Sequence, residues 1–188
     1  MLSEYELEKY LICNCAPTLA SLKSANLFNM PFDTEEHLQE QLDRWNACME
    51  KKGISIYLLR KHHRKALIYV CRKSRLQENL GKPGVASFLE EYGYRNLEID
   101  VVLQRLSQRM KAQEEFPHEI GIFLDYPLGD VIGFIRNAGQ NYKCTGCWKV
   151  YCDECAAKKL FASYRKCQEI YQRQWSGGRS ILQLTVAA

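Results

Sequence analysis

The sequence predicts an α+β domain with a small, mainly antiparallel three-stranded sheet covered by about six helices. Two runs rich in apolar, β-branched and aromatic residues, Ile54–Arg60 and Ala66–Arg72, are joined by five polar residues and predict a β-hairpin with a basic tip. Apolar residues from Leu97 to Glu114 recur at the spacing of one helix face. Lys143–Cys152 is expected to supply the third strand, which completes the sheet.

The remaining helices are expected from their caps and their apolar spacing. Pro17 disfavours helical geometry at the residue before it, so a first helical segment is expected to break at Cys13–Pro17 and a second to run from Thr18 to Phe28. Asp33, with Glu36 three residues later, has the pattern of a capping box. The other helices expected are Asp33–Gly53, Ser74–Leu80, Val85–Tyr92, Pro127–Gly139 and one that begins at Asp153.

Length and composition predict one globular domain. The 188 residues suffice for a single core of ordinary size. Hydrophobic residues make up 46% and charged residues 26%, which is typical of a globular protein and too apolar for a disordered chain. The domain is expected to span residues 1–188, with an N-terminal Cys-Ala-Pro-Thr segment (1–30), a helix, basic β-hairpin and helices (34–115), and a His-Glu segment, third strand and long C-terminal helix (116–188).

The sequence lacks the signals of membrane insertion and export. It has no run of about 18 apolar residues, and its acidic N-terminal stretch does not resemble a signal peptide. A cytoplasmic protein without a membrane partner is therefore expected. Nine cysteines could indicate a secreted disulfide scaffold, but the odd count, the length and the missing export signal favour reduced thiols or metal ligands.

Positive charge is concentrated in one segment. No acidic residue occurs between Glu50 and Glu78, whereas this interval holds nine lysine and arginine residues and the whole chain has a formal net charge of +4. Such asymmetry can mark an anionic partner. Residues 60–75 are therefore a candidate surface for nucleic acid or an acidic partner, with Tyr57 and Tyr69 nearby for stacking. The same pattern fits a solvated hairpin tip, which is the favoured interpretation, so nucleic acid is not the partner expected.

Two Cys-x-x-Cys pairs lie close together in the sequence: Cys144 with Cys147, and Cys152 with Cys155. Four thiolates can hold zinc in tetrahedral geometry. Only four residues separate the pairs, whereas zinc-binding pairs are usually separated by about 12 to 20, so one metal would require a tight turn at residues 148–151. The alternatives are a redox-active pair and plain buried or exposed thiols, and the last is favoured.

A histidine–glutamate dipeptide and an early cysteine are the candidate catalytic residues. His118 could act as a general base or a metal ligand, and Glu119 could orient it or accept a proton. The alternative is a capping histidine beside a salt-bridged glutamate. Cys15 is expected just before a helix N-terminus, where the pKa of a thiol is lowered and the thiol gains thiolate character. His118 could serve as its base, oriented by Asp125, Asp130 or the adjacent glutamate, whereas the alternative is a packed cysteine.

A family resemblance rests on several motifs that occur in one order along the chain: Cys15–Ala20, Ala25–Phe28, Phe116–Gly121, Phe123–Leu124, Tyr126–Pro127, Asp130–Val131, Gly133–Ile135 and Trp148–Tyr151. From about Cys15 to the C-terminal end, the chain resembles a bacterial domain-of-unknown-function family, number 3793, found mainly in gut and other anaerobes. The resemblance implies a cytosolic bacterial protein. It draws attention to eight residues without assigning them roles: Cys15, Lys23, His118, Glu119, Tyr126, Asp130, Trp148 and Lys149.

The chain departs from the family pattern at a few positions. The family tends to carry glycine where this chain has Ser21 and Asp125, and other residues are usual at Cys147, Cys152 and Cys155. The resemblance therefore argues against a four-thiolate metal site. Relatives encoded near iron-uptake and flavodoxin genes imply iron or redox physiology, so iron joins zinc as a candidate metal.

The function expected from these features is binding of a small molecule or a metal ion. The pocket is expected where the segment after Cys15 meets His118–Glu119 and Trp148–Lys149. The residues expected to bind the ligand are Lys23, Tyr126, Asp130, Trp148 and Lys149. The alternatives are a cysteine-dependent hydrolase or transferase that uses Cys15 and His118, and a protein that binds nucleic acid or an acidic partner through residues 60–75.

Overall fold

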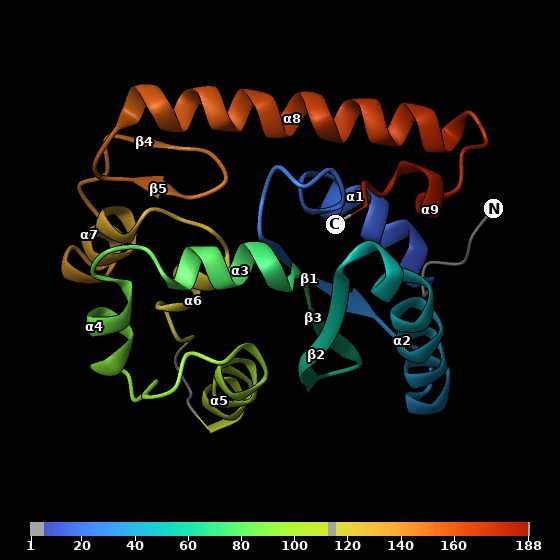
Figure 1. Cartoon of the computed structure of the whole chain (residues 1–188), viewed down its shortest axis with the longest axis horizontal. Coiled ribbons are helices and arrows are strands. Elements are labelled where there is room, and N and C mark those ends of the chain that lie inside the picture. Colours follow the sequence, from blue (N-terminus) through green and yellow to red (C-terminus); the bar gives the residue numbers. More distant parts are fainter. Residues whose placement is uncertain (1–5, 113–115, 188) are drawn as a thin grey trace. The chain divides into compact units, whose positions relative to one another are not determined.

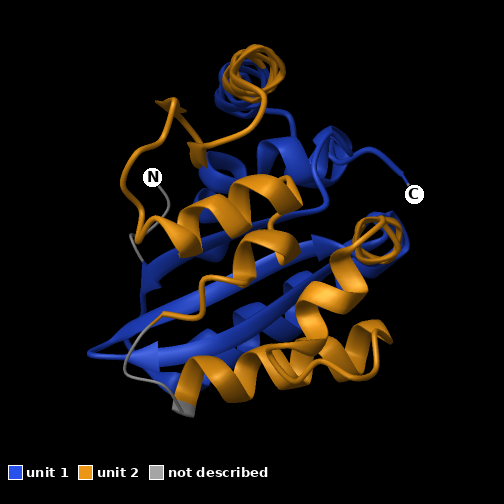
Figure 2. Ribbon diagram, turned by 90° about the vertical axis from the view of Figure 1, so that its left-hand side faces the viewer, with its two compact units in different colours: residues 1–75, 167–188 blue, residues 76–166 orange. Residues whose placement is uncertain are grey.

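The computed structural model of the protein describes residues 6–112 and 116–187. The chain divides into two compact units, one formed by residues 1–75 and 167–188 and the other by residues 76–166 (Figure 2). We call them unit 1 and unit 2. The chain passes from one unit to the other within two helices, α3 (Lys73–Leu80) and α8 (Glu154–Ser176). The expectation of a single domain over residues 1–188 stays a prediction.

Unit 1 contains an antiparallel three-stranded sheet with the strand order β1-β3-β2 (Figure 1). Its strands are β1 (Ala25–Pro31), β2 (Ile54–His62) and β3 (Lys65–Arg72). The predicted hairpin is confirmed, because β2 and β3 pair from Ile54 opposite Arg72 to His62 opposite Lys65. The predicted α+β fold class is confirmed as well.

Two expectations about the third strand of this sheet are wrong. The strand is β1, which pairs with β3 along its whole length, and not a part of Lys143–Cys152. The segment Thr18–Phe28, expected to be one helix, instead ends α1 and begins β1. The reason is an alternation of period two: Phe28 and Met30 are buried on either side of the exposed Asn29, so an extended chain buries both apolar side chains.

Helix α1 (Leu7–Leu19) continues through Pro17, where a break was expected. Proline lacks the N–H group that would bond to the carbonyl oxygen of Cys13 one turn earlier. That oxygen accepts a hydrogen bond from the side-chain amide of Gln168 instead, 155 residues later in the sequence. Because the helix does not break, Cys15 lies inside it and not just before the start of another helix.

Unit 1 is completed by α2 (Glu35–Met49), the 3₁₀ turn η1 (Glu50–Lys52), the end of α8, and α9 (Ile181–Leu184). The cap of α2 is Thr34 and not the predicted Asp33, because the Thr34 hydroxyl accepts a hydrogen bond from the N–H of His37 at 3.1 Å. The helices pack against one face of the sheet. That face is formed by Phe28, Met30, Ile54, Ile56, Ala66, Ile68 and Val70.

Arg72 is a buried arginine at the end of β3, with 1% of its surface exposed. Its guanidinium group donates hydrogen bonds to four main-chain carbonyl oxygens: those of Thr18, Leu19 and Val186, each at 2.7 Å, and that of Lys52 at 2.9 Å. Thr18 and Leu19 are the last two residues of α1, where carbonyl groups lack helical partners and carry partial negative charge. Burial lowers the pKa of Arg72. This arginine therefore belongs to the core of unit 1 and not to the basic surface expected over the hairpin.

Unit 2 is mainly helical and includes one short β-hairpin. Besides parts of α3 and α8, its elements are α4 (Val85–Glu90), α5 (Ile99–Ala112), α6 (Ile120–Phe123), α7 (Leu128–Arg136), β4 (Cys144–Thr145) and β5 (Lys149–Val150). α3, α4, α5, α7 and α8 confirm five of the predicted helices, with ends that differ by a few residues. Residues 113 and 114, at the end of the predicted helix Leu97–Glu114, lie outside the described residues. β4 and β5 pair with each other (Figure 1).

Ser21 and Asp125 have left-handed backbone conformations, with φ of 58° and 65°. Glycine is usual at both positions in the family that the sequence resembles, and glycine adopts such values without strain. We expect Ser21→Gly and Asp125→Gly each to raise the free energy of unfolding by about 1 kcal/mol. Each variant also loses one weak 3.4 Å contact, that of Ser21 with Arg75 or that of Asp125 with Lys82, which offsets the gain only in part. Urea unfolding measures the gain. The control is Ser107→Gly in the interior of α5, which is expected to lose stability, and a loss in Ser21→Gly would contradict the strain.

Candidate ligand-binding cavity

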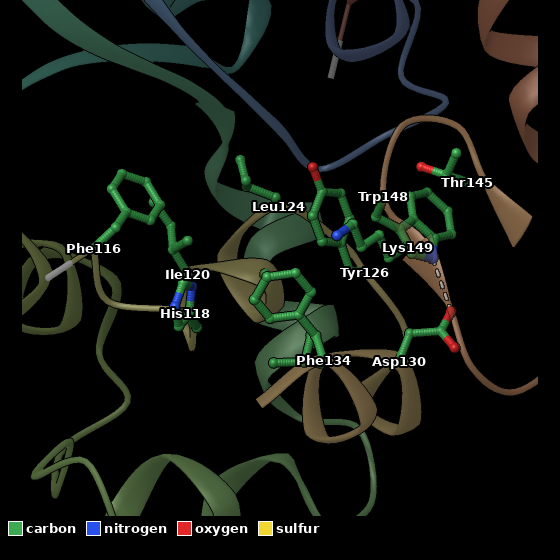
Figure 3. A pocket seen from close by; sticks show the side chains of 12 residues that line it. Phe116, His118, Ile120, Leu124, Tyr126, Asp130, Phe134, Thr145, Trp148 and Lys149 are labelled. Atoms are coloured by element: carbon green, nitrogen blue, oxygen red, sulfur yellow. Dashed lines mark hydrogen bonds between the residues drawn. The ribbon is translucent and has the colours of Figure 1, made fainter. Parts of the chain in front are cut away.

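A cavity of about 400 Å³ lies within unit 2 (Figure 3). Its volume falls in the range of sites for small organic molecules, about 300 to 1,000 Å³. Four aromatic side chains line it, with four polar ones and four apolar or glycine residues: Phe116, Tyr126, Phe134 and Trp148; His118, Asp130, Thr145 and Lys149; Ile120, Gly121, Leu124 and Val131. Phe116 and His118 lie at one end of the cavity, and Trp148 and Thr145 at the other (Figure 3).

Close packing around α7 fixes the walls of this cavity. At Gly121 in α6, a Cβ atom would come within 2.7 Å of the side chain of Val131 in α7. At Gly133 in α7, a Cβ atom would come within 2.5 Å of the ring of Tyr151, which follows β5. Both distances are shorter than ordinary van der Waals contacts. Only glycine lets α6 and the segment after β5 approach α7 this closely.

Asp130 is a buried carboxylate on α7 that joins this helix to the β4–β5 hairpin, with 2% of its surface exposed. Its Oδ2 accepts a hydrogen bond from Trp148 Nε1 at 2.8 Å, the dashed line in Figure 3. Its Oδ1 accepts hydrogen bonds from the backbone N–H groups of Tyr151 and Cys152, both at 2.8 Å. A carboxylate that binds three donors holds them in fixed positions. Asp130 therefore orients the indole ring that forms one wall.

The Trp148 ring is held on two further sides. It stacks on Tyr126 with 4.9 Å between ring centroids and 28° between ring planes. The edge of Phe161, on α8, meets it at 4.5 Å and 79°. The hydroxyl of Tyr126 donates to the carbonyl oxygen of Cys147 at 3.2 Å, and burial raises the pKa of Tyr126 to about 12. Tyr126 is therefore neutral at physiological pH, and the stacked pair of rings forms one wall of the cavity.

Lys149 places a positive charge beside this surface. Its Nζ donates a hydrogen bond to the carbonyl oxygen of Gly139 at 2.7 Å and lies 4.9 Å from the ring centroid of Tyr142 and 5.7 Å from that of Phe134. Within residues 6–112 and 116–187, no carboxylate lies within ion-pair distance of this ammonium group. Since an ammonium group has three N–H donors, Lys149 keeps donors for a ligand.

His118 and Glu119 do not form the pair considered above, because one side chain is exposed and the other is buried. His118 is exposed at the rim of the cavity, with its ring 4.9 Å from that of Phe134. Glu119 is 1% exposed; its Oε1 forms an ion pair with Arg109 and accepts a hydrogen bond from the hydroxyl of Tyr94 at 3.2 Å. Burial and the charge of Glu119 raise the pKa of Tyr94. The alternative of a salt-bridged glutamate is thus observed.

Cys15 and Lys23 both belong to unit 1, so neither is part of the unit that holds the cavity. Cys15 has no exposed surface and packs in the core of unit 1. Burial raises the pKa of its thiol, and the charge of Lys23, itself 4% exposed, offsets this rise in part. A nucleophilic cysteine must reach its substrate as a thiolate. The position of Cys15 therefore gives no support to cysteine-dependent hydrolase or transferase chemistry and matches the alternative, a packed cysteine.

The four cysteines of the Cys-x-x-Cys pairs surround the β4–β5 hairpin. Cys144 lies opposite Val150, and the turn between the strands carries Cys147. Burial, and to a smaller extent the charge of Asp130, raise the pKa of the Cys152 thiol. The sulfur atom of Cys152 packs against Gly129, where a Cβ atom would lie only 2.4 Å from it. In the part of the chain that the structure describes, no three histidine, cysteine, aspartate or glutamate side chains are grouped to hold a metal ion. The candidate site of Cys144, Cys147, Cys152 and Cys155 for zinc or iron is therefore not supported by this geometry.

The cavity brings together Tyr126, Asp130, Trp148 and Lys149, four of the residues expected to bind a ligand, and His118 lies at its rim. Sequence reasoning did not assign seven other lining residues to the site, among them Phe116, Phe134 and Thr145. One signal could have revealed Phe134, because it follows Asp130 by four residues and so lies on the same face of α7. Thr145 becomes recognisable only through its pairing with Lys149.

Fold and cavity together define an α+β protein with an aromatic-lined cavity of small-molecule size. The chain belongs to the family described as "Protein of unknown function (DUF3793)", whose family model matches residues 11–185, and the predicted resemblance is confirmed. No curated protein and no solved structure matches the chain. None of the helices in the described part of the chain combines the length and the apolar character needed to cross a lipid bilayer.

Proposed function

We propose that this protein binds a small organic molecule that combines a flat aromatic ring with an anionic group, in the cavity of unit 2. One observation carries the proposal: the Lys149 ammonium group, with no carboxylate partner among the described residues, lies beside a wall of stacked aromatic rings. The metal ion that the sequence allows as an alternative ligand is less well supported, since no metal-binding group occurs among the described residues.

The aromatic wall supports the ring of the ligand. Tyr126 and Trp148 already stack on each other, and Asp130 and Phe161 hold the indole from two sides. Binding to a preformed surface costs less conformational entropy than binding that must first order the side chains of the site. Each aromatic pair contributes about 0.5 to 1.5 kcal/mol beyond its buried area, so a planar ring is preferred over a flexible aliphatic group.

The charges around the cavity support an anionic substituent. Lys149 supplies a fixed positive charge, and His118 at the opposite end supplies a second polar group that can donate a hydrogen bond. The one carboxylate in the lining, Asp130, already binds three donors. A hydrogen bond to a charged group contributes about 1.5 to 3 kcal/mol. An anionic group therefore gains more from this cavity than a neutral one.

The proposed place in the cell is the bacterial cytoplasm. This proposal follows the expectation that the family resemblance carries. A link to iron or redox physiology, which the family resemblance implies, is part of this proposal.

Trp148 allows a direct test of the proposed ligand class. The chain has three tryptophans, so replacing Trp45 and Trp175 with phenylalanine leaves the cavity indole as the single reporter. The probes are 1-anilinonaphthalene-8-sulfonate and its uncharged counterpart, N-phenyl-1-naphthylamine. We expect both to quench Trp148 saturably, with the sulfonate bound at least tenfold more tightly, which corresponds to about 1.4 kcal/mol.

Variants of two lysines decide whether the charge acts locally. Lys149→Gln is expected to abolish the tenfold preference for the sulfonate. The control is Lys158→Gln on α8, whose ammonium group is exposed and paired with Glu154 at 2.6 Å, and it should leave the preference unchanged. Absence of saturable quenching by either probe would contradict the proposal, and an equal loss of preference in both variants would reject Lys149 as the anion-binding group.

A further inference from the structure

The hairpin of β2 and β3 in unit 1 contains an irregularity that changes which side chains share a face of the sheet. Leu58 lies opposite Ile68, but Arg60 lies opposite Leu67, so β2 carries one extra residue, Leu59, between them. Because side chains alternate between the two faces of a strand, one inserted residue moves every later side chain of that strand to the other face.

This one-residue insertion, a β-bulge at Leu59, changes the face on which the basic residues at the end of β2 lie. Before it, Ile54 and Ile56 point into the core of unit 1. Without the extra residue, Arg60 and His62 would continue on that core face. With the extra residue, Arg60 lies on the same face as its pairing partner Leu67. Because Leu67 is next to the core residue Ile68 in β3, this face is the one opposite to the core of unit 1. Basic side chains are thereby moved away from the helix-covered face.

Lys61 shows the effect of the same shift in the opposite direction. Its partner in β3 is Ala66, a core residue, so Lys61 lies on the face covered by the helices. There its Nζ forms an ion pair with Glu35, the first residue of α2, at 2.5 Å. Two neighbouring basic residues of one strand thus have different environments, one paired with a carboxylate and the other not.

A hollow of about 310 Å³ lies on the face to which Arg60 is moved. Its floor is Leu67, which pairs with Arg60 on one side and with Asn29 of β1 on the other. The remaining lining consists of His62, His63 and Lys65. The lining contains no carboxylate, and among the described residues none forms an ion pair with Arg60 or Lys65.

Asp33 and Glu35, which line an adjoining hollow together with His62 and His63, are engaged elsewhere. Asp33 accepts hydrogen bonds from the backbone N–H of Thr34 at 2.7 Å and from the ring of His37 at 2.8 Å. Glu35 binds Lys61. The positive charge of the hollow is therefore not neutralised by the start of α2.

The turn that joins the strands is strained. His63 and Arg64 have φ values of 45° and 56°, in a two-residue hairpin loop where asparagine and glycine are the usual residues. A left-handed conformation costs a residue other than glycine about 1 to 2 kcal/mol. Such strain is frequent at functional sites. Here it keeps a histidine side chain in the lining of the hollow, where glycine would supply none.

We propose that this hollow binds the phosphate group of a small molecule. A phosphate group has several acceptor oxygens around one centre, and the guanidinium fork of Arg60, the ammonium group of Lys65 and the amide of Asn29 offer donors from three strands. Among the residues that the structure describes, no tyrosine, tryptophan or phenylalanine lines the hollow. Because nucleic-acid sites combine such charges with stacking platforms, the lining favours a free phosphate ester over a polynucleotide.

Pyrophosphate is the probe for this site, measured by isothermal titration calorimetry with the full chain at 50 mM and 200 mM NaCl. We expect saturable binding that weakens with salt. Arg60→Gln and Lys65→Gln should each weaken it at least tenfold, whereas Lys65→Arg should restore most of the affinity. The control is Lys61→Gln, which removes the same charge from the neighbouring position on the opposite face and should change the affinity less than twofold. All three substituted side chains belong to the β2–β3 hairpin, and circular dichroism verifies that each of the four variants is folded.

Three outcomes would overturn the proposal. Absence of pyrophosphate binding at millimolar concentration excludes a phosphate site. An equal loss of affinity in Lys61→Gln and Arg60→Gln shows that pyrophosphate is attracted by the summed positive charge of the hairpin and not bound at a localised site. Binding of a twelve-residue oligothymidylate that is abolished by Arg60→Gln, with no binding of pyrophosphate, shows that the hairpin recognises a polynucleotide instead.

Discussion

Replacing Asp130 with alanine is expected to lower the free energy of unfolding by about 3 to 5 kcal/mol. The physical reason is that one carboxylate satisfies three donors: the indole N–H of Trp148 and the backbone N–H groups of Tyr151 and Cys152. Alanine leaves all three without this acceptor inside the protein. Because Trp148 then loses its anchor, the quenching of its fluorescence by the anionic probe should also be lost.

Urea unfolding, followed by circular dichroism and by Trp148 fluorescence, measures the effect of the Asp130 variant. Asp130→Asn keeps one acceptor oxygen and is expected to lose about half as much. The matched control is Asp153→Ala, which removes an exposed carboxylate with a single hydrogen bond, from the N–H of Ala156 at 2.9 Å, and should cost about 1 kcal/mol. Equal losses for Asp130→Ala and Asp153→Ala would show that the three hydrogen bonds of Asp130 stabilise the fold no more than the single exposed one of Asp153.

Replacing Arg72 with methionine is expected to cost about 3 to 4 kcal/mol of stability. Methionine fills much of the volume but leaves four carbonyl oxygens, those of Thr18, Leu19, Lys52 and Val186, without the guanidinium donors. Arg72→Lys keeps the charge but not the planar fork, so it should recover less than half of the loss.

Hydrogen exchange provides a local readout of the Arg72 variant. The N–H of Val186 bonds to the carbonyl oxygen of Leu19 at 3.0 Å, next to the guanidinium group. Its exchange should accelerate in Arg72→Met more than the global loss of stability requires. The matched control is Arg75→Met. Among the described residues, the one hydrogen bond of the Arg75 side chain is a 3.4 Å contact with Ser21, so this substitution should cost less than about 1 kcal/mol. An unchanged exchange rate at Val186 would contradict the capping role of Arg72.

The parts of the fold that the sequence predicts are those with strong local signals. The β2–β3 hairpin follows from two apolar runs around a polar tip, and α5 and α8 follow from apolar residues at helical spacing. β1 could not be recognised in the same way, because its seven residues become a strand through pairing with β3, some forty positions later. The continuation of α1 through Pro17 depends likewise on Gln168, at the other end of the chain.

The candidate site was predictable in part for the same reason. Tyr126, Asp130, Trp148 and Lys149 belong to short motifs that lie close in sequence, and the structure places them around one cavity. Their ligand-binding role stays a prediction. The burial of Cys15 could not be foreseen, because it follows from α1 being longer than its proline suggests. The separation of His118 from Glu119 depends on Arg109 in a different helix.

Residues 167–186 join unit 1 although all of unit 2 lies between them and residue 75. During translation, the ribosome releases Gln168 and the acceptor oxygen of Val186 only after unit 2 has left the exit tunnel. Helix α1 and the guanidinium group of Arg72 form these contacts only when the last residues of the chain have been synthesised. Unit 1 is therefore expected to complete its folding after unit 2, whose residues lie between the two segments of unit 1. An amino-terminal fragment that stops before α8 is therefore expected to bind chaperones.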